Sequence, residues 1–176
     1  ILVIVNAFFA SAEMAIVSIN KTKLNLLAEE NNKKAKLLLN LLKDASGFLA
    51  TIQVGITFAG FFASASAATS ISKGLGLYLS NLGVPYGDDI ALLLTTLIIS
   101  YITLVLGELV PKRIALQNAE KVAMFSVKPI IFISKFTKPF VWFLSISTNS
   151  ILRLFGIKDK SGEEKISREE IKSLVE

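Results

Sequence analysis

The chain has 176 residues, of which 52% are hydrophobic and 19% are charged, and it contains neither histidine nor cysteine. This composition is more apolar than that of a soluble domain, and it excludes a Ser-His-Asp hydrolase, a disulfide framework and a thiolate metal site, so any bound metal would have to be held by oxygen. The formal net charge of +5 comes from basic residues that lie between apolar segments, so we expect the lipid bilayer as the partner, and no nucleic acid.

Residues 1–19 carry one charge, Glu13, and would span roughly 28 Å as a helix, which predicts a first membrane helix. Small residues form one stripe of this helix, where another helix can approach closely: Ala7, Ser11, Ala15 and Ser18. Asn6, Glu13 and Asn20 recur every seven residues on a different face. Ser11 and Glu13 lie about 200° apart on an ideal helix. They cannot both face one ion unless the helix is distorted, so Glu13 needs a second partner.

Residues 20–44 hold six lysines among leucines at helical spacing, which predicts two short amphipathic helices around a polar turn at 29–34. Residues 45–72 carry no charge and form the predicted second membrane helix. Its polar and small stripe comprises Ser46, Gln53, Thr57, Gly60 and Ser64. Gln53 is either an ion ligand or an interhelical hydrogen-bonding group. Residues 73–89 are rich in glycine and are predicted to form a loop, with one short helix as an alternative.

Residues 90–112 form the predicted third membrane helix. Its expected polar face consists of Thr96, Ser100, Thr103 and Gly107. Pro111 has no N–H to donate to the carbonyl of Gly107, four residues back, so this carbonyl is predicted to be free. The Glu108 carboxylate beside it supplies a second oxygen, and together they predict half of a cation site. The alternative is that Glu108 extends to the surface or pairs with Lys112 at i+4.

Residues 113–157 are interrupted by lysines, and Pro129 and Pro139 are expected to break the helix twice. Lysines on one side and large apolar residues on the other favour helices that lie in the cytoplasmic interface. A fourth membrane helix over 139–157 is the alternative. The predicted fold is therefore an all-α membrane protein, with three transmembrane helices and juxtamembrane amphipathic helices on the cytoplasmic side.

We expect this domain in the plasma membrane, and the placement of its lysines predicts its topology. The segments after the first and third spans are rich in lysine, so the positive-inside rule puts the N-terminus outside and the C-terminus in the cytoplasm. Residues 1–157 then form the membrane domain, and residues 158–176 form a charged linker to further protein. This topology places Glu13 about 12 Å, Gln53 about 10 Å and Glu108 about 6 to 8 Å from the cytoplasmic ends of their helices. All three spans thus bring oxygen-rich residues to the cytoplasmic half of the membrane, which favours a cation site.

The chain carries three ordered motifs: residues 9–13 (FASAE), 51–57 (TIQVGIT) and 107–112 (GELVPK). Together they resemble the transmembrane domain of the CorC/CNNM family of magnesium transporters. Residues 167–176 (SREEIKSLVE) look like the segment that leads into that family's cytoplasmic CBS-domain pair. The resemblance covers essentially the whole chain.

The resemblance implies a homodimer of three-span protomers that moves Mg²⁺ out of the cytoplasm, coupled to Na⁺. It also implies a dehydrated Mg²⁺ held by Ser11, by polar groups of the second span, and by the Gly107 carbonyl with Glu108. Many relatives carry Asn after the glycine of the second motif, where this chain has Ile56. The remaining second-span candidates are Gln53 and Thr57.

Asn6 and Glu13 are candidates for supporting these ligands or for binding the coupling ion. Gly107 and Pro111 are the natural hinge for alternating access. Two other functions stay open: a membrane anchor that holds cytoplasmic domains or a partner without transport, and a proton or sodium carrier that Mg²⁺ only regulates. We expect no enzyme, because the sequence has no nucleophile–base pair.

Overall fold

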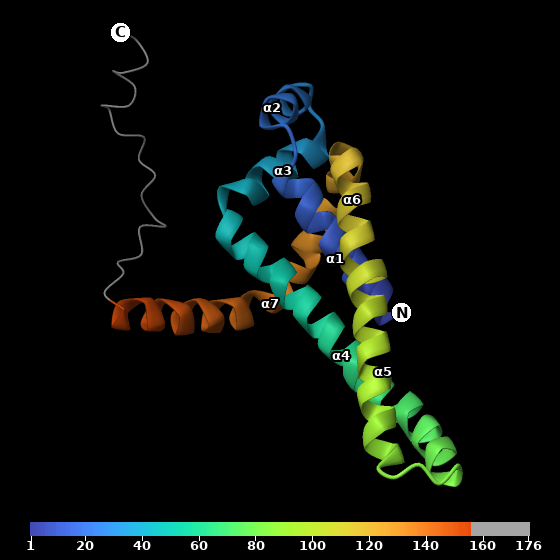
Figure 1. Ribbon diagram of the computed structural model, residues 1–176. Helices are drawn as coiled ribbons and strands as arrows, with labels where there is room; N and C mark the ends of the chain where they lie inside the picture. Colours follow the sequence, from blue (N-terminus) through green and yellow to red (C-terminus); the bar gives the residue numbers. More distant parts are fainter. Residues whose placement is uncertain (156–176) are drawn as a thin grey trace. The chain divides into compact units, whose positions relative to one another are not determined.

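A computed structural model describes residues 1–155, and over this range the chain is helical with no strand (Figure 1). The predicted linker at 158–176 lies outside the described residues. The chain divides into two compact units, Ile1–Thr137 and Lys138–Glu176. The first unit holds every residue of the predicted ion site.

The helices follow one another with short connections. In chain order they are α1 (Leu2–Val17), α2 (Lys21–Glu29), α3 (Lys33–Lys43), α4 (Ala45–Asn81), α5 (Gly87–Leu104), the π-helical turn η1 (Val105–Leu109), α6 (Val110–Gln117) and α7 (Ala119–Leu154).

Short polar side chains set the beginnings of three of these helices. The side chains of Asn20, Asn32 and Asp44 accept hydrogen bonds from backbone amides of the first turns of α2, α3 and α4. Such caps replace partners that the first turn of a helix lacks. Between α2 and α3, Asn31 adopts a left-handed backbone conformation with φ 64°. The two short helices predicted around this polar turn are therefore confirmed.

The predicted loop at 73–89 is wrong for most of its length, because α4 continues to Asn81. Two of the glycines that suggest a loop, Gly74 and Gly76, lie inside this helix, where each costs about 1 kcal/mol relative to alanine. Packing explains one of them: a Cβ on Gly76 would collide with the side chain of Asp88, at the start of α5. Gly76 thus lets α5 begin close against α4, and the actual turn contains Gly83 with φ 73°.

A buried stripe, with members four or eight residues apart, runs along α5, η1 and α6. Its buried members are Ala91, Thr95, Thr103, Gly107, Pro111 and Ala115. The residues of the polar face predicted for this helix differ in their burial: Ser100 is exposed, and the Thr96 hydroxyl donates a hydrogen bond to the carbonyl of Leu92 in its own helix. Thr103 and Gly107 do lie on the buried stripe.

The prediction that Pro129 and Pro139 break the helix is also wrong, since the helical assignment of α7 runs through both. A proline removes one backbone hydrogen bond, and in apolar helices neighbouring groups can compensate for that loss.

Three segments are long and apolar enough to cross a membrane, by length and composition: α4, Gly87–Gln117 and α7. The number of spans agrees with the prediction, but one assignment differs. The predicted first span ends at Val17 after 16 residues, and only the pair α1 and α2, bent by 88°, would count as a fourth. Conversely, α7 qualifies as a span by length and composition, which differs from the interfacial helices that the sequence predicts for this region.

Helix α1 is the centre of the first unit, since it packs against α4, η1 and α6. Its face toward α4 is apolar, with Phe9 buried against Gly55, where an added Cβ would lie 2.6 Å from the ring. Its small residues Ala12 and Ala15 are fully buried in the same core. The predicted close-packing role of small residues in this helix is confirmed for Ala15.

Candidate ion site at the π-helical turn

The site begins with an irregularity in the third span. In η1 the amide of Val110 donates to the carbonyl of Val105, five residues back instead of four. Pro111 follows at the start of α6 and has no N–H to donate to Gly107. Single π-helical turns of this kind occur frequently at functional sites. Here the turn carries both Gly107 and Glu108.

The Gly107 carbonyl, predicted to be free, accepts a hydrogen bond from a side chain of α1. The donor is Nδ2 of Asn6, at 3.1 Å in a buried position. Gly107 leaves room for this contact, because a Cβ there would lie 3.1 Å from the same nitrogen. Asn6 is 2% exposed, and its Oδ1 has no hydrogen-bond partner within the described part of the chain. An oxygen acceptor without a partner therefore lies beside the Gly107 carbonyl.

One ammonium group joins two carboxylates from different helices. Nζ of Lys112 lies 2.9 Å from Oε1 of Glu108 and 3.1 Å from Oε2 of Glu13. The three side chains are between 24% and 32% exposed, so water reaches them only in part. This pairing confirms the alternative in which Glu108 meets Lys112 at i+4. It also supplies the second partner that Glu13 was predicted to need.

The seven-residue spacing of Asn6 and Glu13 places them on one face of α1, and that face meets the third span. Asn6 contacts η1 and Glu13 contacts α6. The third member of the pattern, Asn20, instead caps α2 through Lys23. The π-helical turn is thus bordered on the α1 side by an amide and a carboxylate.

The other predicted ligands lie elsewhere. Ser11 and Pro111 line a mostly apolar cleft of about 370 Å³ between α1, α6 and the first turns of α7, together with Phe8, Phe125 and Ser126. Gln53 and Thr57 lie on an exposed face of α4, where Nε2 of Gln53 is 3.5 Å from Oγ1 of Thr57. The five predicted ligand residues therefore occupy three places. Only Gly107 and Glu108 lie at the π-helical turn, where Glu108 and Glu13 share Lys112.

The residue that the sequence reasoning left out of the site is Lys112. Its i+4 spacing from Glu108 was the available signal, but spacing along one helix could not show that Glu13 reaches the same ammonium from α1. Among residues 1–155 no group of three or more acidic side chains could hold a metal. An ion here would therefore combine two carboxylates with neutral oxygens, the kind of ligands that Mg²⁺ and Na⁺ accept.

Comparison with known proteins places this arrangement in a family. The family model for the cyclin M (CNNM) transmembrane N-terminal domain matches residues 1–176. The chain is 38% identical to the UPF0053 protein sll0260 of Synechocystis, covering 100% of the chain and 40% of that relative. It is 31% identical to a UPF0053 protein of Haemophilus influenzae and 30% identical to YhdP of Bacillus subtilis, covering 39% of each.

The chain therefore spans about 40% of the length of these curated relatives, all of which extend beyond the matched region. The match covers the three motifs, the π-helical turn and the paired carboxylates in one domain. This chain belongs to the CNNM family and represents its transmembrane domain.

Proposed function

We propose that this domain moves Mg²⁺ out of the cytoplasm across the plasma membrane, coupled to Na⁺, through an ion site at the π-helical turn. The observation that carries the proposal is the convergence of Glu13 and Glu108 on a single cation, Lys112, beside the Gly107 carbonyl. Carboxylates in membrane helices are costly, and they usually mark ion pathways. The identity of the ion and its direction come from the resemblance of the three motifs to CorC/CNNM transporters.

Lys112 acts in this proposal as an internal cation that the transported ion displaces. Two carboxylates with one ammonium between them keep one net negative charge. Mg²⁺ in the same place cancels both carboxylate charges, and its preference for oxygen is met by adding the Gly107 carbonyl and Oδ1 of Asn6. When the ion leaves, Lys112 returns and prevents two unpaired carboxylates from facing each other at membrane depth. The exchange therefore keeps the site's charge small in both states.

The remaining predicted ligands reach the ion when the third span changes direction at its hinge, which Gly107 and Pro111 form. Ser11 lines the same cleft as Pro111, so a change of helix direction there moves the two relative to each other. Gln53 and Thr57 lie on the exposed face of α4 and complete the shell when the third span moves against α4 or a second copy packs on that face. We propose that the functional unit is a homodimer, and that the relatives' additional length corresponds to cytoplasmic CBS domains.

Ion-dependent stability tests this proposal directly. The protein in detergent is heated in Mg²⁺, Ca²⁺ or Na⁺ against a K⁺ baseline, because a ligand that binds only the folded state raises the melting temperature. We expect a Mg²⁺-selective rise that Glu108→Gln abolishes. The control is Glu120→Gln, which removes an equal charge from an exposed pair with Lys23 outside the site. An equal Mg²⁺ response in the wild type and Glu108→Gln would contradict the proposed site.

A second candidate function is a membrane anchor without transport. It is favoured by the fact that Lys112 already pairs both carboxylates while Asn6 satisfies the Gly107 carbonyl, as expected of a network that only joins helices. The same titration separates the two functions, since an anchor shows no ion-selective rise. Vesicles loaded with a Mg²⁺ indicator and given a Na⁺ gradient then distinguish transport from binding alone.

A further inference from the structure

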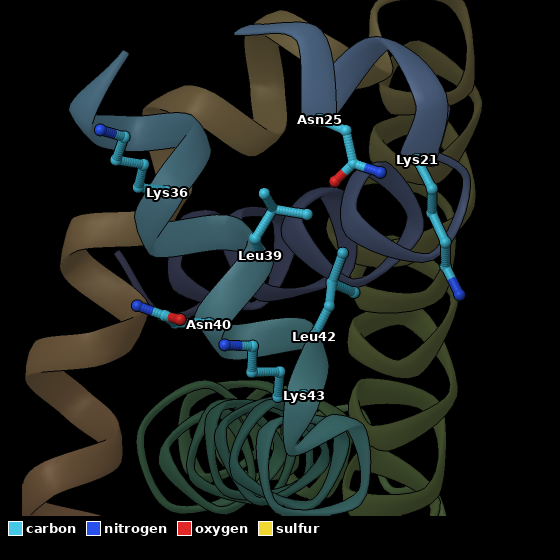
Figure 2. A pocket seen from close by; sticks show the side chains of 7 residues that line it. All are labelled: Lys21, Asn25, Lys36, Leu39, Asn40, Leu42 and Lys43. Carbon is cyan, nitrogen blue, oxygen red and sulfur yellow. The ribbon is translucent and has the colours of Figure 1, made fainter. Parts of the chain in front are cut away.

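A second polar site lies between α2 and α3, away from the π-helical turn. It is a pocket of about 520 Å³, and Figure 2 shows the seven side chains that line it. They are Lys21, Asn25, Lys36, Leu39, Asn40, Leu42 and Lys43. Five of the seven end in nitrogen donors, and no carboxylate belongs to the lining. The pocket therefore offers positive charge and hydrogen-bond donors without an internal counter-charge.

Helical spacing gathers these donors on one face of each helix. On α3, Lys36, Asn40 and Lys43 follow at i, i+4 and i+7, and on α2 Lys21 and Asn25 follow at i and i+4. The opposite face of α3 is fixed, because Ala35 and Leu38 are fully buried in the core. The donors thus lie on two helices that contact each other, and the opposite face of α3 is packed into the core.

The acidic and amide groups nearby leave the positive charge in place. Asp44 is next to Lys43 in sequence, but its Oδ1 accepts from the amide of Gly47 and caps α4. Nζ of Lys36 donates to Oδ1 of Asn31 at 2.7 Å, which is a neutral partner. Three lysines in one concave surface repel one another unless an anion lies among them. The charge pattern therefore fits an anionic ligand.

The position of the pocket in the fold indicates which class of anionic ligand it would bind. Helices α2 and α3 connect α1 to α4, and α4, a candidate membrane span, begins at Ala45, two residues after Lys43. In Figure 2, Leu39 and Leu42 of α3 lie between the lysines, facing Asn25. A cationic rim around leucines at the end of a membrane helix suits a molecule with an anionic head and apolar chains.

We propose that this pocket binds the phosphate-bearing headgroup of an anionic phospholipid. The ammonium groups of Lys21, Lys36 and Lys43 pair with the phosphodiester oxygens, and the amides of Asn25 and Asn40 donate hydrogen bonds to the headgroup. Leu39 and Leu42 contact the first carbons of the acyl chains. Such a lipid would hold the α2–α3 pair, and with it the ends of α1 and α4, at the membrane surface.

The test compares two pairs of lysines on the same helix. The full-length protein in detergent is titrated with phosphatidylglycerol or phosphatidylcholine, and retained lipid is counted by native mass spectrometry. We expect selective retention of phosphatidylglycerol, and a weakening of about fivefold for each lysine removed in Lys36→Gln/Lys43→Gln. The control, Lys33→Gln/Lys34→Gln, removes the same charge from exposed positions of α3 outside the pocket.

Three results would overturn the proposal. Equal weakening in both double variants would mean that diffuse charge, not the pocket, attracts the lipid. Equal retention of phosphatidylcholine, whose choline neutralises the phosphate, would show that the net negative charge of the headgroup is not recognised. Displacement of the lipid by millimolar inorganic phosphate would identify a site for free phosphate instead. Melting curves of both variants without added lipid establish that each is folded before binding is compared.

Discussion

Helix α1 makes two contacts of opposite character, and their difference indicates which part of the domain can move. Toward α4 the contact is dry and close, with the ring of Phe9 seated over Gly55. Toward η1 and α6 it includes a polar network, whose three charged side chains keep between 24% and 32% exposure. An apolar close contact has one good arrangement, whereas ionic groups near water can exchange partners. We infer that α1 and α4 form the rigid part and that partner exchange occurs at the third span.

Breaking the dry contact should have the largest effect on stability. Gly55→Leu places its Cβ about where the Phe9 ring lies, and overpacking of this kind costs on the order of 1–3 kcal/mol. Thermal unfolding in detergent measures the loss. The control is Gly60→Leu, whose Cβ would meet nothing within 4 Å. If Gly55→Leu unfolds at the wild-type temperature, the α1–α4 contact is not the rigid part.

Removing the shared ammonium comes next in expected size. Lys112→Met leaves Glu13 and Glu108 facing each other, and because the pair is only partly buried we expect a loss of about 1–2 kcal/mol, between the values for surface and buried ion pairs. Mg²⁺ should restore more stability to this variant than it adds to the wild type, since its internal competitor is gone. Lys121→Met, at an exposed position of α7, serves as the control. A Mg²⁺ response that falls in Lys112→Met would mean that the lysine assists binding.

Most helices of this fold could be predicted from the sequence, because the strongest sequence signals are local. Uncharged runs predicted α4 and the third span, and the polar residues at 29–34 predicted the break between α2 and α3. The misplaced loop at 73–89 and the unbroken α7 have a common cause. Glycine and proline mark turns in water, but their cost is small beside the backbone hydrogen bonds that an apolar helix must keep.

The candidate site was less predictable, because its contacts join residues about 100 positions apart. The oxygens of Glu108 and Gly107 could be named from one helix, and the spacing of Asn6 and Glu13 showed that they share a face. No periodicity indicates that this face meets the π-helical turn, or that Lys112 lies between the two carboxylates. Likewise, the exposure of Gln53 and Thr57 on α4 depends on how the helices pack.

The contact between Asn6 and the Gly107 carbonyl can be weakened with a smaller effect on stability. Gly107→Ala adds a Cβ 3.1 Å from Nδ2 of Asn6, which has to move by a few tenths of an ångström. The lost hydrogen-bond energy, about 1 kcal/mol, is offset by the better helix propensity of alanine, so the net change should be below about 1 kcal/mol. The Mg²⁺ shift should nevertheless shrink. A full Mg²⁺ shift in Gly107→Ala would remove this carbonyl from the site.

The smallest effect is expected where an ion pair lies in water. Lys23 and Glu120 approach to 2.5 Å between α2 and α7, but their side chains are 61% and 40% exposed. Glu120→Gln should therefore cost less than about 0.5 kcal/mol, and that cost should vanish in molar salt because exposed pairs are screened. Lys112→Met, measured in the same salt series, should keep most of its loss. If both losses vanish together, the carboxylates at the π-helical turn are as well hydrated as a surface ion pair. The contrast between the polar and apolar sides of α1 would then not predict where a bound ion loses its water.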